Sequence, residues 1–286
     1  MLPNLNTALL DLLHEIHGTD VKLIIGGGFG IFLRTGRVRR HGERTLLQEM
    51  PEARSTNDLD LFLRPELLID SQKLKPLAEA LVRLNYQPVR GAEKYQFLKT
   101  ITNGTIASSL KIDILTGPVS HFNGTSVKAD KRRARPNPSI DLHAHPTDEA
   151  LTLDRGLLPE TIIGILSSGH SWQAEVFLPN AYTFLMMKLF AFRDRLDDKN
   201  KQFGSYHAMD MYTILATTTE KEWVEACEIR DSCSEENMVI EAGKLIKQHF
   251  SAQDQFGIIR LKENQYYRPE LQIIDFMSIL QELFPA

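Results

Sequence analysis

Residues 54–63 read RSTNDLDLFL, in which acidic and apolar side chains alternate over residues 58–61. Successive side chains of a β-strand point to opposite faces, so Asp58 and Asp60 share one face while the leucines between them face a core. Two adjacent carboxylates repel each other, and a hard divalent cation with oxygen ligands relieves that repulsion. The pattern predicts a strand that carries a metal site, although Asp-x-Asp is also typical of a solvated strand edge or a turn.

A second strand is predicted over residues 110–115, which read LKIDIL and carry one acidic side chain, Asp113, on the face opposite to the isoleucines. If this strand neighbours the first, three carboxylates converge. Three carboxylates can hold two cations, which stabilise both the attacking and the leaving oxygen of an in-line displacement at phosphorus. We therefore expect Asp58, Asp60 and Asp113 to be catalytic and to ligate two Mg²⁺ ions, with Mn²⁺ as an alternative.

A glycine turn lies upstream of the acidic strand. The apolar run Leu23–Ile25 stops at Gly26-Gly27-Gly28 and resumes at residues 29–33, which predicts a buried strand that turns sharply into a helix. Phosphate sites are often built in this way. A dinucleotide fingerprint would need glycine where Ile31 stands, and no Gly-Lys-Ser/Thr follows the turn, so the sequence favours neither the Rossmann nor the P-loop pattern.

The order of these motifs resembles the nucleotidyltransferase superfamily that includes DNA polymerase beta and kanamycin nucleotidyltransferase, and it is most similar to members from abortive-infection and toxin–antitoxin systems. The resemblance implies an α+β fold, with a small mixed β-sheet flanked by helices followed by a mainly helical C-terminal domain. It also implies transfer of a nucleoside monophosphate from an NTP such as ATP to an acceptor hydroxyl on an RNA end, a protein or a small molecule. A cognate antitoxin would be a further partner.

The resemblance gives each motif a role. Asp58 and Asp60 would ligate both ions, and Asp113 the ion that activates the acceptor hydroxyl. Glycines without a Cβ would let backbone amides approach the triphosphate. The implied nucleotide-binding residues are Gly27, Gly28, Arg54, Thr56 and Lys188. For the lysine, which lies in the otherwise apolar stretch 182–192, the alternative is a side chain that extends to water.

The composition of the chain changes along its length. A polar, basic and proline-broken stretch, KADKRRARPNPS at residues 128–139, is typical of a linker or mobile loop. Beyond Pro179 the apolar spacing is almost wholly helical. We expect a catalytic domain over residues 1–127, a loop-rich linker over 128–175 and a helical domain over 176–286. The arginine-rich residues 34–54 show little periodicity and are interpreted as a surface loop or hairpin.

The formal net charge of −4 excludes a protein that is basic over its whole surface, but two local basic segments stand out, Arg37–Arg44 and Lys131–Arg135. Clustered cations bind phosphates by releasing counterions, so these segments are candidates for contact with tRNA or another RNA acceptor. A charge run is also typical of a solvated loop. His143-Ala144-His145 could ligate a metal, but this spacing in a proline-bounded loop is more typical of a surface turn.

Two further expectations concern location and the alternative function. No apolar run reaches the roughly 20 residues of a membrane helix, and the first residues lack the features of a signal peptide, so we expect a cytoplasmic protein without a membrane partner. The alternative to an enzyme is a non-catalytic nucleotide-binding or partner-binding protein on the same fold. That alternative would be favoured if Asp113 lay far from Asp58 and Asp60.

Overall fold

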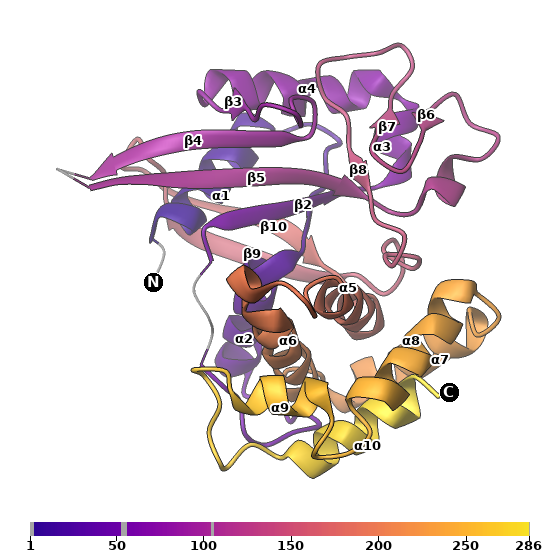
Figure 1. The fold of residues 1–286 in the computed structure, drawn as a ribbon. Coiled ribbons are helices and arrows are strands. Elements are labelled where there is room, and N and C mark those ends of the chain that lie inside the picture. Colours follow the sequence, from indigo (N-terminus) through magenta and orange to yellow (C-terminus); the bar gives the residue numbers. More distant parts are fainter. Residues whose placement is uncertain (1–2, 53–55, 104–105, 286) are drawn as a thin grey trace. The chain divides into compact units, whose positions relative to one another are not determined.

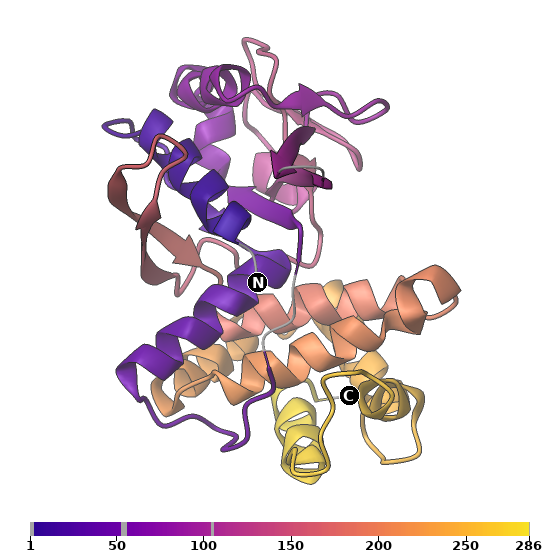
Figure 2. The same ribbon diagram turned by 90° about the vertical axis from the view of Figure 1, so that its left-hand side faces the viewer.

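The computed structural model describes residues 3–52, 56–103 and 106–285. The chain divides into two compact units, shown in Figures 1 and 2: the first comprises Met1–Gly30 and Ser55–Pro179, and the second Ile31–Arg54 and Asn180–Ala286. These boundaries differ from the expected ones. The segment 128–175 belongs to the first unit, and the segment 31–54 groups with the C-terminal helices rather than with the sheet.

A mixed β-sheet is the centre of the first unit. Its strands are β1 (Ile24–Ile25), β2 (Asp58–Leu63), β3 (Gln87–Pro88), β4 (Gln96–Asn103), β5 (Ile106–Thr116), β8 (His145–Pro146), β9 (Leu158–Ile165) and β10 (Ser171–Leu178). They are ordered β3-β4-β5-β2-β1-β10-β9, with β8 beside β5. Strands β2 and β5 pair in parallel, as do β1 with β10 and β5 with β8, while the other neighbours are antiparallel. The expected mixed sheet is confirmed.

Helices pack against the apolar face of this sheet. They are α1 (Pro3–Glu15), α3 (Pro65–Ile69) and α4 (Ser71–Arg83), and α1 contacts β2, β9, β10 and α4. The side chain of Asp70 accepts a hydrogen bond from the amide of Gln72 and so caps α4. Leucines spaced at three and four residues bury one side of this helix. Leu59 and Leu61 of β2 are fully buried, so the alternation in the acidic strand orients it as predicted.

The segment 128–175 is a structured part of the first unit, which corrects its interpretation as a linker. The short 3-10 helix η1 (Val119–Phe122) precedes it. The segment begins with a β-hairpin of β6 (Lys128–Ala129) and β7 (Ala134–Arg135) and continues into β8 and the β9–β10 hairpin. Strand β10 pairs with β1, which lies near the start of the chain. The basic and proline-rich composition of residues 128–139 reflects a hairpin and its connection, not a boundary between domains.

Helix α2 (Gly27–His41) contains most of the arginine-rich stretch, which corrects its interpretation as a loop or hairpin. Arg34 occupies a core position and is 1% exposed. Its Nη2 lies 2.7 Å from Glu222 Oε1, and its Nε donates to the hydroxyl of Thr217 at 3.1 Å. Three basic side chains, Arg39, Arg40 and His41, form the last turn, where cations interact favourably with the helix dipole.

The second unit is helical. Its elements after α2 are α5 (Ala181–Arg193), η2 (Lys199–Gly204), α6 (Ser205–Ala216), α7 (Glu220–Ser232), α8 (Asn237–His249), α9 (Phe256–Lys262) and α10 (Ile273–Leu283). Helix α5 is buried along almost its whole length and is the core of the unit. The predicted helical C-terminal region is confirmed. Among the helices in the described part of the chain, none is long and apolar enough to cross a membrane.

Candidate active site

The three predicted carboxylates lie on one face of neighbouring strands. Strands β2 and β5 pair in parallel, with Asp58 opposite Lys111 and Asp60 opposite Asp113. Directly opposed residues share a face and adjacent strands are about 4.8 Å apart, so the carboxylates occupy one small area of the sheet. The predicted adjacency of the two acidic strands is confirmed, while the roles of the three aspartates in catalysis and metal binding stay predictions.

The glycine turn lies against the carboxylate of Asp60. The Gly26 amide donates to the Asp60 carbonyl oxygen at 2.8 Å, which joins the end of β1 to β2. Gly27 has a φ of +60°, and a Cβ at this position would lie 1.6 Å from Asp60 Oδ2. Gly28 is buried in the first turn of α2, where amides have no partner within the helix. Backbone therefore approaches the acidic face more closely than any side chain would permit.

Asp113 is a largely buried carboxylate. Its side chain is 13% exposed, and its Oδ2 lies 2.8 Å from Lys111 Nζ. Its other oxygen, Oδ1, is buried and has no hydrogen-bond partner among the described residues. Burial raises the pKa of Asp113 above its usual value, and the ion pair with Lys111 opposes this effect.

Lys111 is a site residue that the sequence analysis did not single out. Burial lowers its pKa, but the hydrogen bond and charge of Asp113, together with the charges of Asp58 and Asp60, outweigh burial and raise the pKa. The ammonium group therefore balances part of the negative charge of the carboxylate face. A signal was present in the sequence, because a residue two positions before Asp113 on the same strand must share its face.

The three aspartates supply the oxygen ligands that a hard cation prefers, but their side chains are not positioned as a formed metal site. Three carboxylates on one face and the unpartnered Oδ1 of Asp113 supply the oxygen ligands that Mg²⁺ prefers. As the side chains stand, however, the described residues contain no group of three or more His, Cys, Asp or Glu that could hold a metal ion. Binding of two ions would require Lys111 to release Asp113 and the carboxylates to turn toward each other.

Two other predicted nucleotide-binding residues, Thr56 and Arg54, come just before β2. Thr56 precedes β2, and its hydroxyl accepts a hydrogen bond from the amide of Asp58 at 3.4 Å. The carbonyl of Asn57 accepts from the amide of Lys111 at 3.3 Å, which holds the start of the strand beside β5. Arg54 lies outside the described residues. A contact of Thr56 or Arg54 with a triphosphate stays a prediction.

Lys188 belongs to the second unit and forms a buried ion pair there. Its Nζ lies 2.8 Å from Asp210 Oδ2, and the two side chains are 7% and 3% exposed. The alternative interpretation, in which Lys188 extends to water, is therefore wrong, because the ammonium group is buried within the helical unit. In this structure the partner of the lysine is Asp210, and its contact with a phosphate stays a prediction.

We predict that Lys188→Met lowers the free energy of unfolding by about 3–5 kcal/mol, because it leaves the buried Asp210 carboxylate without this cation. Urea denaturation followed by circular dichroism measures the change. Lys244→Met, at an exposed position of α8, is the control and should change stability by no more than about 0.5 kcal/mol. Unchanged stability together with weaker nucleotide binding would instead assign Lys188 to the nucleotide site.

Each of the two basic segments lies partly in a helix or strand and partly in a turn. Arg37–Arg44 includes the end of α2 and the turn that follows it. Lys131–Arg135 covers the tip of the β6–β7 hairpin, where the Asp130 carboxylate accepts from the amides of Arg132 and Arg133. His143 is 5% exposed, which corrects its interpretation as a surface-turn residue, and His145 stacks on Tyr95 at a ring separation of 5.5 Å.

Comparisons with known proteins identify no family for the chain. No family model matches it, and no curated protein matches it. Among solved structures, it is similar to the solution structure of the antibiotic-resistance factor ANT(2'')-Ia, with 14% sequence identity and a TM-score of 0.33. The similarity covers 81% of this chain and 99% of that chain.

Proposed function

We propose that this chain is a Mg²⁺-dependent nucleotidyltransferase, which transfers a nucleoside monophosphate from an NTP to an acceptor hydroxyl. The observation that carries the proposal is the placement of Asp60 directly opposite Asp113 on parallel strands, with the Gly27 turn against the Asp60 carboxylate. The acidic face would hold the cations, and the adjacent amides at the start of α2 would bind triphosphate oxygens. Carboxylates and phosphate-binding amides side by side suit a metal–nucleotide substrate.

The proposed reaction is an in-line substitution at the α-phosphorus of the NTP. The acceptor hydroxyl releases its proton to solvent, its oxygen forms a bond to the α-phosphorus, and the bond from that phosphorus to the departing pyrophosphate breaks. Bound divalent cations would neutralise charge on the attacking and leaving oxygens. Asp58 and Asp60 would bind both ions and Asp113 the one beside the acceptor, while Gly27 and Gly28 would orient the triphosphate.

The second candidate is a non-catalytic protein that binds a nucleotide or a partner through the same face. One observation favours it: Lys111 already occupies Asp113 Oδ2, an oxygen that a second metal ion would need. A permanent ion pair would leave the chain with one metal site at most, and two-metal chemistry would not assemble. The two candidates therefore differ in how many ions bind with the nucleotide.

Isothermal titration of each NTP, with Mg²⁺ or with EDTA, tests the proposal on the wild type and on Asp58→Ala/Asp60→Ala. We expect binding that requires Mg²⁺ and that the double variant loses, because it removes the carboxylates predicted to hold both ions. Circular dichroism verifies that the variant is folded. No binding by folded wild type would contradict the proposal, and Mg²⁺-independent binding that survives the double substitution would favour the non-catalytic candidate.

A further inference from the structure

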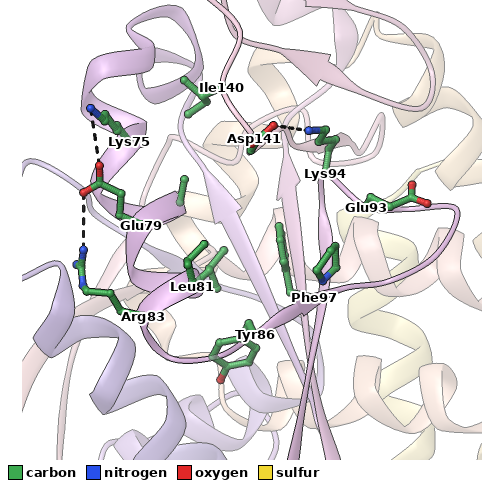
Figure 3. A pocket seen from close by; sticks show the side chains of 13 residues that line it. Lys75, Glu79, Leu81, Arg83, Tyr86, Glu93, Lys94, Phe97, Ile140 and Asp141 are labelled. Atoms are coloured by element: carbon green, nitrogen blue, oxygen red, sulfur yellow. Dashed lines mark hydrogen bonds and ion pairs between the residues drawn. The ribbon is translucent and has the colours of Figure 1, made fainter.

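A cavity lies away from the acidic face. It has a volume of about 670 Å³, is open to solvent on one side, and is lined by α4, β4 and the segment around residues 140–141. Apolar side chains form its walls, among them Leu81, Tyr86, Phe97 and Ile140. Figure 3 shows charged side chains of α4 along one side of it, and Glu93 and Lys94 on the other side. This volume lies within the roughly 300–1,000 Å³ of small-molecule sites.

The pairing of the strands separates this cavity from the proposed nucleotide site. Phe97 pairs with Ile112, and Gln96 pairs with Asp113. Because directly opposed residues share a face, Phe97 lies on the helix-covered face and the carboxylates lie on the other. A ligand of the cavity would therefore bind on the opposite side of the sheet from the NTP and would not compete with it for space.

At one end of the cavity the cations Lys94, Arg132 and Arg133 outnumber the carboxylates of Glu93 and Asp141. Glu93 and Lys94 also line a second hollow, of about 240 Å³, that extends to Arg132 and Arg133 on the β6–β7 hairpin. Within the described residues neither of these guanidinium groups forms an ion pair. Lys94 forms an ion pair with Asp141, whose side chain is 94% exposed, and an ion pair so open to water adds little stability. A bound anion could replace it.

The hairpin is fixed in place beside Lys94. The amide and carbonyl of Ala134 exchange hydrogen bonds with those of Ala144, and the amide of His143 donates to the carbonyl of Lys94 at 2.8 Å. Both ring nitrogens of His143 are buried without a partner among the described residues. Burial is the main cause that lowers the pKa of His143 to about 4; the charges of Arg133, Lys94 and Arg135 lower it further, and Asp141 opposes them.

We infer that the two adjoining hollows bind one amphipathic anion, an apolar chain or ring system that carries a phosphate or carboxylate group. Its apolar body lies against Leu81 and Phe97, and its anionic group lies near Lys94 and Arg133. A neutral apolar molecule would leave the cations unused, and a small inorganic anion would leave the apolar walls exposed to water. This site does not depend on the proposed nucleotidyl transfer.

Isothermal titration with four probes tests the inference: dodecyl phosphate and dodecanoate, each below its critical micelle concentration, dodecanol below its solubility limit, and inorganic phosphate. We expect the two anionic amphiphiles to bind at least tenfold more tightly than dodecanol, with no measurable binding of inorganic phosphate. The comparison of dodecyl phosphate with dodecanoate identifies the preferred anionic group. Equal affinity for dodecanol, or binding of inorganic phosphate alone, would overturn the inference.

Variants of the cavity locate the bound probe. Ala78→Trp fills the apolar part and Val82→Glu places a negative charge on its exposed wall, and each should weaken dodecyl phosphate binding at least tenfold. Arg132→Gln/Arg133→Gln removes two cations and should weaken it about tenfold. Lys221→Gln/Lys244→Gln, which makes the same charge change in the second unit, should have no effect. Unchanged binding in folded Val82→Glu and in the arginine variant would refute the site.

Discussion

Gly27→Ala is expected to weaken Mg²⁺-dependent NTP binding by roughly 100-fold or more, since loss of partners around a metal ligand already costs about 10–100-fold in affinity. The added Cβ would lie 1.6 Å from Asp60 Oδ2, so the carboxylate has to leave its position. An alanine at a φ of +60° also strains the backbone, which should lower the free energy of unfolding by about 1–3 kcal/mol. Titration calorimetry and urea denaturation measure the two effects.

Gly42→Ala is the matched control for this substitution. Gly42 has a φ of +61°, nearly the same as Gly27, but no atom lies within 4 Å of the position of its Cβ. The control should therefore show the backbone strain without the displacement of Asp60. Equal NTP binding by both variants would contradict the assignment of Gly27 to the nucleotide site, because it would show that the approach to Asp60 is irrelevant to binding.

The acidic face could be predicted from the sequence because its signals are local. Alternation over residues 58–61 and 110–115 orients each strand, since only one register buries the leucines and isoleucines. The pairing of these strands also agrees with the expectation, with Asp60 opposite Asp113. Lys111 was missed for a different reason: its position on the acidic face followed from the same alternation, but a lysine beside aspartates is not itself a metal ligand.

Features that depend on distant partners could not be predicted in the same way. Strand β10 is stabilised by pairing with β9 and β1, and the exposed Ile163 and Ile165 weaken the alternation that would have indicated the hairpin. Arg34 occupies a buried helical position because Glu222, from a distant helix, balances its charge. An arginine where helical spacing requires an apolar residue concealed the periodicity of α2, and the segment was interpreted as a loop.

The second large effect is expected for Asp113→Asn, which should reduce the number of divalent ions bound with the nucleotide from two to one. Electron paramagnetic resonance of Mn²⁺, with a non-hydrolysable NTP analogue present, measures this number. Asparagine keeps the size of the side chain but removes its charge, and Asp113 is the carboxylate assigned to the ion beside the acceptor. The ion held by Asp58 and Asp60 with the triphosphate should stay bound, so nucleotide affinity should fall far less than in Asp58→Ala/Asp60→Ala.

Lys111→Met separates the metal role of Asp113 from its ion pair. Lys111 Nζ lies 2.8 Å from Asp113 Oδ2, so the ammonium group and the second ion compete for one oxygen. Removing the lysine frees that oxygen and should tighten binding of the second Mn²⁺, while Asp113→Asn should abolish it. If the wild type and both variants each bind a single ion, the second metal site does not form even when the ammonium group is removed, and the non-catalytic candidate is favoured. If the wild type binds two ions and Asp113→Asn still binds two, Asp113 is not a metal ligand and the second ion must use another carboxylate.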